Sequence, residues 1–279
     1  MSSNDLIFER FLSEEIERRY GTGWSGNVDN NVRERAINAF SLRVADALQR
    51  ALLRCIHLSN LMKSERGVHF MRFGAGRRLH MIWYAYSDLI FALPPERTAP
   101  LTSDQSAQLN ENLNSIYIHM RGVLDNVSWA LLHEYAPEDV KELKPVCVGL
   151  FEPCICKGPT FQSIAKQIEK HRKWYTELKS RRDPVTHQMP LIVCPQVLTS
   201  EQSRAYNEAL QRYERAVARN DWNAAKGELD VTEQIGKFYP WFFHDPDEEP
   251  LPIYPTVPSD VGHLVSLFRA VDSFFVERS

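Results

Sequence analysis

Apolar residues recur at helical spacing over much of the chain. They repeat every three or four residues from about Asn31 to Met62, and again from about Arg77 to Phe91, where Pro94-Pro95 stops the pattern. A third run follows Thr102 or Ser103, either of which is a suitable N-cap, and a fourth extends from about Thr160 to Lys179. Four long helices with one apolar face each predict an all-α protein built around an antiparallel helical bundle.

The chain after Pro184 is interrupted by prolines and predicts shorter elements. Residues 189–195, Met-Pro-Leu-Ile-Val-Cys-Pro, favour an extended segment that is at most an edge strand, because proline cannot donate to a sheet ladder. The capping pattern Thr199-Ser200-Glu201-Gln202 predicts a helix that ends at about Arg219, and a shorter helix is expected over residues 221–235.

The stretch from His244 to Ser259 contains five prolines and four acidic residues, which predicts an extended connector without a helix. A final helix follows, in which Leu264, Phe268, Val271 and Phe275 are spaced by four, three and four residues. We therefore expect three parts: a partly helical segment over residues 1–30, a helical bundle over 31–198, and a helical extension over 199–279 docked on the bundle.

Composition is that of a folded chain, with 43% hydrophobic and 25% charged residues. The formal charge of -3 does not favour a nucleic acid by itself, so such a partner would need a local basic patch. The five cysteines are an odd set, no signal peptide precedes them, and no run of 18 apolar residues occurs. We expect a cytoplasmic protein that has no disulfides and does not enter a membrane.

The sequence contains no glycine-rich phosphate loop, no His-Glu-x2-His helix motif and no Gly-x-Ser-x-Gly elbow. Cys147, Cys154 and Cys156 lie close together but lack the Cys-x2-Cys spacing of structural zinc sites. We therefore expect neither a cofactor nor a metal ion.

The segment Arg182-Asp183-Pro184-Val185-Thr186-His187 is the best candidate for chemistry. Asp183 is a favourable N-cap and Pro184 a favourable first helical residue, so we expect a new turn here that directs Arg182 and His187 toward one cleft. A guanidinium binds phosphate oxygens in a bidentate manner, and an imidazole moves protons near neutral pH. Together they suit attack of a ribose 2′-hydroxyl on the neighbouring phosphodiester without a metal.

The helix before this segment is basic. Between residues 169 and 182, six lysines and arginines stand against two glutamates. A polyanion would be attracted there, and we expect Lys173, Lys179 and Arg181 to contact RNA. The spacing of Arg182 and His187 is not specific by itself, because 23 arginines and 9 histidines in 279 residues predict about 0.7 such pairs by chance. A cap-and-turn arginine with a surface histidine is the alternative.

The segment from Leu178 to His187, at the end of a predicted bundle, resembles the HEPN superfamily. That family's pattern is an arginine, a polar residue such as Asn or Asp, and a histidine after four to six intervening residues. The resemblance is specific over this short motif, and over residues 75–192 it is one of architecture. In the family the motif more often lies within a continuous helix, and Pro184 departs from that pattern.

The resemblance implies a helical bundle that often dimerises with the motif lining a cleft. Many members of the family are metal-independent endoribonucleases of toxin or antiviral systems, so the resemblance also implies this activity. By position, Arg182 would stabilise the charge of the phosphate, and Asp183 would help to position Arg182. His187 would be the general acid or base.

A second polar segment interrupts the third predicted helix at Gly122, Asp125 and Asn126. Glycine lowers helix stability, so a close helix contact is expected at Gly122. Asp125 would pair with Arg182 or orient His187, with Asn126 in support. The alternative is a polar pair satisfied by a neighbouring helix.

These patterns favour a HEPN-like endoribonuclease that acts on single-stranded or looped RNA as a homodimer, with an antitoxin-like protein as a further partner. A non-catalytic HEPN-like scaffold that binds RNA or nucleotide is one alternative. Another is a helical interaction module that uses its last helix and the aromatic cluster over residues 238–243.

Overall fold

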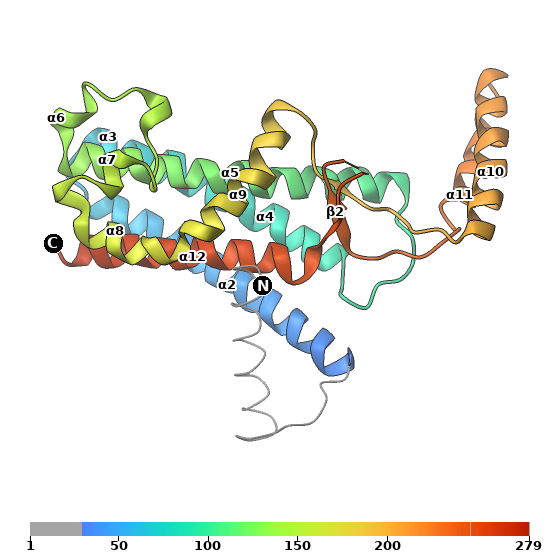
Figure 1. The fold of residues 1–279 in the computed structure, drawn as a ribbon, viewed down its shortest axis with the longest axis horizontal. Helices are drawn as coiled ribbons and strands as arrows, with labels where there is room; N and C mark the ends of the chain where they lie inside the picture. The colour runs from blue at the N-terminus through green and yellow to red at the C-terminus, as the bar shows by residue number, and fades with distance from the viewer. Residues whose placement is uncertain (1–29, 246, 279) are drawn as a thin grey trace.

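The computed structural model describes residues 30–245 and 247–278 and shows an α-helical bundle (Figure 1). Four long helices of the bundle are α2 (Asn30–Leu61), α4 (Arg77–Ala92), α5 (Ser103–Tyr135) and α12 (Ile253–Val276). Their apolar faces share one continuous core, which confirms the predicted all-α bundle. The expected partly helical segment over residues 1–30 lies outside the described residues, apart from the first residue of α2.

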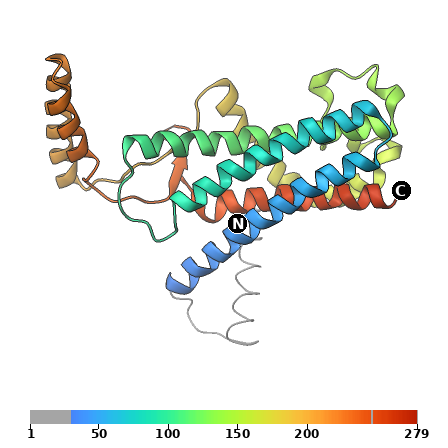
Figure 2. The same ribbon diagram turned by 180° about the vertical axis from the view of Figure 1, so that it is seen from behind.

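Helix α12 belongs to the bundle and packs along α2 (Figures 1 and 2). The predicted apolar face of Leu264, Phe268, Val271 and Phe275 is buried, and burial stabilises the fold by about 1.5–3 kcal/mol for each such side chain. Helix α12 contributes to the core of the bundle itself, because apolar residues surround most of this helix and require burial on several sides.

Helix α5 begins where the sequence indicated. The Thr102 side chain accepts a hydrogen bond from the Gln105 backbone, and the Gln105 side chain accepts one from the Thr102 backbone. The apolar stripe that follows is buried against α4. This packing fixes the rotation of α5 and so determines where Arg121 and Asp125 lie.

The fourth predicted helix is divided into three short helical segments and one longer helix. The short segments η3 (Pro159–Phe161), α8 (Gln162–Ile168) and η4 (Glu169–His171) precede α9 (Arg172–His187). The expected new turn at Asp183 was wrong, because α9 continues through Pro184 to His187.

Tertiary packing explains why α9 does not stop at its proline. Proline removes one N–H donor, but its φ angle is compatible with a helix. Val185 packs against the core, and the Gln188 backbone N–H donates to the Pro184 carbonyl at 2.7 Å, which closes the last turn. These contacts hold the end of α9 in helical form.

Three short strands lie near one end of the bundle: β1 (Ile192–Val193), β2 (Trp241–Phe243) and β3 (Leu251–Pro252). They form an antiparallel sheet in the order β1-β2-β3, so β1 is the predicted edge strand. The connector over residues 244–259 is not free of helix, as we had expected. Helix α12 already begins at Ile253, although the backbone of Tyr254 is not helical and kinks it there. The helix continues from Pro255, because proline is tolerated in the first turn of a helix.

Helices α10 (Ser200–Ala218) and α11 (Trp222–Thr232) form a hairpin that stands away from the bundle (Figure 1). The predicted capping box at Thr199 is present at the start of α10. No helix among the described residues is long and apolar enough to cross a membrane. The remaining short elements are α3 (Glu65–Val68), the π-helix η1 (His69–Gly76), α6 (Pro137–Val140), η2 (Pro145–Cys147) and α7 (Pro153–Cys156).

Candidate anion-binding site

Arg182 and His187 both lie on α9, but the helix does not turn them toward each other. Successive residues rotate by about 100°, so positions five apart differ by about 140° around the axis. Arg182 is 27% exposed and lies toward α5, whereas His187 is exposed at the end of the helix. No hydrogen bond or ion pair joins these two described side chains.

Arg182 lies near Asp125 of α5. Asp125 also forms an ion pair with Arg121, in which 3.1 Å separate Arg121 Nε from Asp125 Oδ1. Burial raises the pKa of Asp125, and the positive charges of Arg121 and Arg182 oppose that shift. Two arginines from different helices therefore share one partly buried carboxyl group.

Arg78 of α4 approaches the same carboxyl group and further opposes the rise of its pKa. Arg78 Nη1 lies 3.0 Å from His119 Nδ1, and a Cβ atom at Gly122 would lie 2.6 Å from Arg78 Cζ. The absence of a side chain at Gly122 thus makes room for this arginine, which is the close contact expected there. Burial and Arg78 lower the pKa of His119, which favours a neutral imidazole.

We call Arg78, Arg121 and Arg182 the arginine cluster. Three buried donors in or beside it have no hydrogen-bond acceptor among the described residues: Arg121 Nη1, Arg182 Nε and the Tyr175 hydroxyl. Tyr175 lies against Arg121, whose Cζ is 5.0 Å from the ring centroid. A buried donor without an acceptor costs about 1–3 kcal/mol. An anion with several oxygens, such as a phosphate group, would supply the missing acceptors.

Two carboxylates offset part of the positive charge. Besides Asp125, Asp183 accepts a hydrogen bond from Arg182 Nη1 at 3.2 Å, while about half of its own side chain is exposed. Asp183 therefore contacts the arginine that it was expected to place. A third acidic residue, Glu152, lies beside Arg121, because a Cβ atom at Gly149 would meet Glu152 Cγ at 2.9 Å and Arg121 Nη2 at 3.5 Å. The unsatisfied donors therefore favour an anion as ligand more than the total charge does.

Asn126 does not contact the arginine cluster through a hydrogen bond. It donates to the Gly122 carbonyl at 2.6 Å and packs against Gly74 of the π-helix η1. This is the alternative that we considered for it, a polar side chain satisfied within and between helices. Its contribution is to hold α5 and η1 close together.

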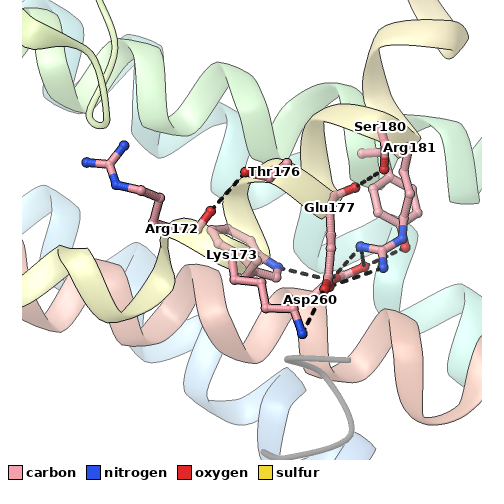
Figure 3. Close-up of polar contacts among 9 residues, drawn as sticks. Arg172, Lys173, Thr176, Glu177, Ser180, Arg181 and Asp260 are labelled. Atoms are coloured by element: carbon pink, nitrogen blue, oxygen red, sulfur yellow. Dashed lines mark hydrogen bonds and ion pairs between the residues drawn. The ribbon is translucent and has the colours of Figure 1, made fainter. Parts of the chain in front are cut away.

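Arg181, which we expected to contact RNA, points into the protein instead (Figure 3). It is 8% exposed, and its Nη1 donates to both carboxylate oxygens of Asp260 at 3.1 Å. Asp260 of α12 also accepts hydrogen bonds from Trp174 Nε1 at 2.9 Å and from the Tyr117 hydroxyl at 2.7 Å. Burial would lower the pKa of Arg181, but Asp260 holds it above its usual value. The expectation that Arg181 contacts RNA was wrong, because this side chain faces α12. Only residues on the other faces of α9 reach solvent.

Lys173 and Lys179 are exposed on α9, as an RNA contact would require. Lys173 lies 4.0 Å from Glu177, and Lys179 is one helical turn before Arg182. Lys179 is thus on the surface close to the arginine cluster, whereas Lys173, nine residues before Arg182, lies on the opposite side of α9.

A second buried polar contact joins η4 to α12. His171 Nδ1 lies 2.8 Å from His263 Nδ1, and the Trp174 ring stacks on His263 with 5.2 Å between centroids. Burial, with a smaller effect of Lys170, lowers the pKa of His171 to about 4. One of the two nitrogens must donate and the other accept, so the two rings cannot both be charged, and the lowered pKa of His171 favours its neutral form.

No group of three or more His, Cys, Asp and Glu side chains in the described part of the chain is arranged to hold a metal ion. Cys147, Cys154 and Cys156 are free thiols.

Sequence reasoning missed Arg78, Arg121 and Tyr175. Arg121 and Asp125 are four residues apart on a predicted helix, and that spacing is a usable signal for an ion pair. Arg78 has no such signal, because only the packing of α4 against α5 brings it to Asp125.

We compared the chain with protein-family models, curated proteins and solved structures, and none of them matches it. Function must therefore be inferred from the residues themselves.

Proposed function

We propose that this protein binds RNA and that the arginine cluster holds one of the backbone phosphates. The observation that carries this proposal is the set of three buried donors without acceptors beside Arg78, Arg121 and Arg182. A phosphate group would accept their hydrogen bonds and interact with the positive charge of the three arginines. Hydrogen bonds to charged groups contribute about 1.5–3 kcal/mol, so loss of one arginine should weaken binding by about 10- to 150-fold.

Two features favour RNA over a small free anion. The segment from Arg182 to His187 resembles the motif of the HEPN superfamily, many members of which act on RNA. Lys179 adds exposed positive charge one helical turn before Arg182, where a neighbouring phosphate of a chain would lie. A free phosphate or nucleotide would bind at the cluster without using this lysine.

The test is fluorescence anisotropy with a labelled single-stranded RNA of roughly ten nucleotides. Arg182→Ala is expected to weaken binding by about 10- to 150-fold. Arg212→Ala is the matched control, because Arg212 is a partly exposed arginine on α10 that pairs with Glu228. Wild-type affinity in Arg182→Ala would refute the proposal.

Metal-independent cleavage of the bound RNA is the second candidate function. It is favoured by the continuity of α9 through Pro184, which places the motif within one helix as in most HEPN relatives. The 2′-oxygen would form a bond to phosphorus while the bond from phosphorus to the 5′-oxygen breaks. His187 would take the 2′-hydroxyl proton, a water molecule would protonate the leaving 5′-oxygen, and Arg182 would bind the phosphate.

Cleavage requires His187 and Arg182 to act on one phosphodiester, although they differ by about 140° around α9. A homodimer in which His187 of one protomer meets the arginine cluster of the other would achieve this.

Incubation with RNA in EDTA tests the candidate: wild type cleaves, while His187→Ala binds without cleaving. A mixture of His187→Ala and Arg182→Ala protomers regains activity only when two chains share the site. A wild type that binds RNA without cleaving it would eliminate this second function and leave the first intact.

A further inference from the structure

The segment from Arg66 to Ser87 combines positive charge with aromatic rings. It contains four arginines, two histidines and five aromatic residues, but no aspartate or glutamate. Folded as η1 and α4, it exposes Phe73, Arg77, His80 and Tyr84. Their spacing of four, three and four residues places them along one helix face, and we call them the aromatic ladder.

Neighbouring members of the aromatic ladder touch one another. Arg77 Cζ lies 5.0 Å from the Phe73 ring centroid, and the His80 and Tyr84 centroids are 4.7 Å apart. Phe73 is 44% exposed and Tyr84 is 54% exposed, so part of each side chain is accessible from solvent. At a rise of 1.5 Å per residue the ladder extends over roughly 16 Å.

The aromatic ladder is connected to the arginine cluster through α4. Arg77 belongs to the ladder, and the next residue, Arg78, reaches His119 and Asp125 on α5. Gly74 of η1 packs directly against Asn126, which brings this end of the ladder close to α5. The π-helix itself is a rare conformation that is found frequently at functional sites.

We propose that the aromatic ladder is a stacking surface for the bases of single-stranded RNA whose phosphate is held by the arginine cluster. This inference rests on the proposed function. Aromatic faces stack on bases of any sequence, and arginine adds cation–π and phosphate contacts. At about 3.4 Å per stacked nucleotide, a ladder of roughly 16 Å accommodates about four or five nucleotides.

The surface chemistry favours a nucleic acid over a protein partner. Arg77 and His80 lie between the rings of Phe73 and Tyr84, and no acidic side chain occurs between Arg66 and Ser87. A polyanion with flat apolar bases matches both properties at once. In a double helix the base faces are stacked on each other, so the ladder should discriminate against duplex RNA.

The test compares three labelled probes of equal length: a single-stranded RNA, the same backbone without bases, and a duplex. The double variant Phe73→Ala/Tyr84→Ala should bind the single strand about fivefold or more weakly for each ring lost. Its affinity for the abasic backbone and its salt dependence should not change, because no phosphate contact is removed. Leu53→Ala is the control, since Leu53 is a 62% exposed apolar residue on α2.

The outcomes separate this inference from the proposed function. Wild-type affinity in the ring variant, with lost affinity in Arg182→Ala, overturns the inference and leaves the proposed function standing. Unchanged affinity in both variants overturns both. Equal losses of RNA affinity in the ring variant and in Leu53→Ala would also overturn the inference. A loss of self-association in the ring variant without a loss of RNA affinity would overturn it too, and would identify a protein contact.

Discussion

Arg181 and Arg182 are adjacent on α9, yet Arg181 is bound to Asp260 of α12 while Arg182 lies near Asp125 of α5. The first arginine is 8% exposed and belongs to a satisfied ion pair in the core. The second retains a buried Nε without an acceptor. One helix thus presents a structural arginine and a candidate ligand-binding arginine at consecutive positions.

This difference predicts opposite effects of two neighbouring substitutions. Arg181→Ala leaves the Asp260 carboxylate buried without its cation and should lower the free energy of unfolding by about 3–5 kcal/mol. Arg182→Ala should lower it by about 1 kcal/mol or less, because Asp183, its ion-pair partner, is about half exposed. Urea denaturation of both variants measures the two values. Equal losses of stability would contradict the assignment.

Asp125 should limit the affinity of the arginine cluster for RNA. It is a negative charge among three arginines, and burial raises its pKa, so it takes up a proton at a higher pH than an ordinary carboxyl group. RNA affinity should therefore increase as the pH falls through the raised pKa of Asp125. Protonation of His119 acts in the same direction and occurs at a lower pH than for an ordinary histidine, because burial and Arg78 lower its pKa.

Asp125→Asn should bind RNA up to about fivefold more tightly at neutral pH and lose most of this pH dependence. Anisotropy titrations over a pH series measure both effects. Asp230→Asn, an exposed carboxylate on α11, is the control and should retain the wild-type profile. A wild-type profile in Asp125→Asn would exclude Asp125 from the site.

The substitution Gly122→Ala should affect the stability of the fold and its affinity for RNA in different ways. An added Cβ would meet the guanidinium of Arg78, a flexible end that can move away, while alanine favours the helix by about 0.5–1 kcal/mol. We expect a free energy of unfolding that is equal or higher and an RNA affinity that is several-fold lower, because Arg78 is displaced from the cluster. Thermal denaturation and anisotropy test this together. A less stable variant with wild-type affinity would show that Arg78 serves only the fold.

His171 should make the fold sensitive to acid. Its pKa is lowered from 6.5 to about 4 by burial, so below about pH 6.5 the unfolded chain binds a proton that the folded chain does not. Stability is therefore lost as the pH falls from 6.5 toward 4, by at most about 1.4 kcal/mol per pH unit.

His171→Gln should flatten this part of the stability curve in urea denaturation at several pH values. His187→Gln, which changes an exposed histidine, is the control and should keep the wild-type slope. An unchanged slope in His171→Gln would mean that other groups cause the acid sensitivity.

Local signals in the sequence predicted much of the fold. The Thr102 and Thr199 capping boxes and the apolar face of Leu264 and Phe268 appear where expected, because caps and periodicity act within a few residues. Pro184 was misjudged because packing of Val185 against the core holds the helix beyond it.

The candidate site was only partly predictable. Arg182, Asp183 and Asp125 were singled out from their types and positions, and the structure places them near one another. Arg181 was assigned to RNA because basic residues in a run look alike in sequence, and only the position of Asp260 on α12 distinguishes it. Arg78 required the packing of α4 on α5, which no local pattern specifies.

The most direct test of the central claim is the salt dependence of RNA binding in wild type and in Arg182→Ala. For a single strand, the slope of log K against log salt changes by about 0.7 for each phosphate that the protein neutralises. If the arginine cluster holds a phosphate, Arg182→Ala should lower the slope by about that amount, while Arg212→Ala should leave it unchanged. An Arg182→Ala protein with the wild-type slope and affinity would show that the cluster does not bind RNA.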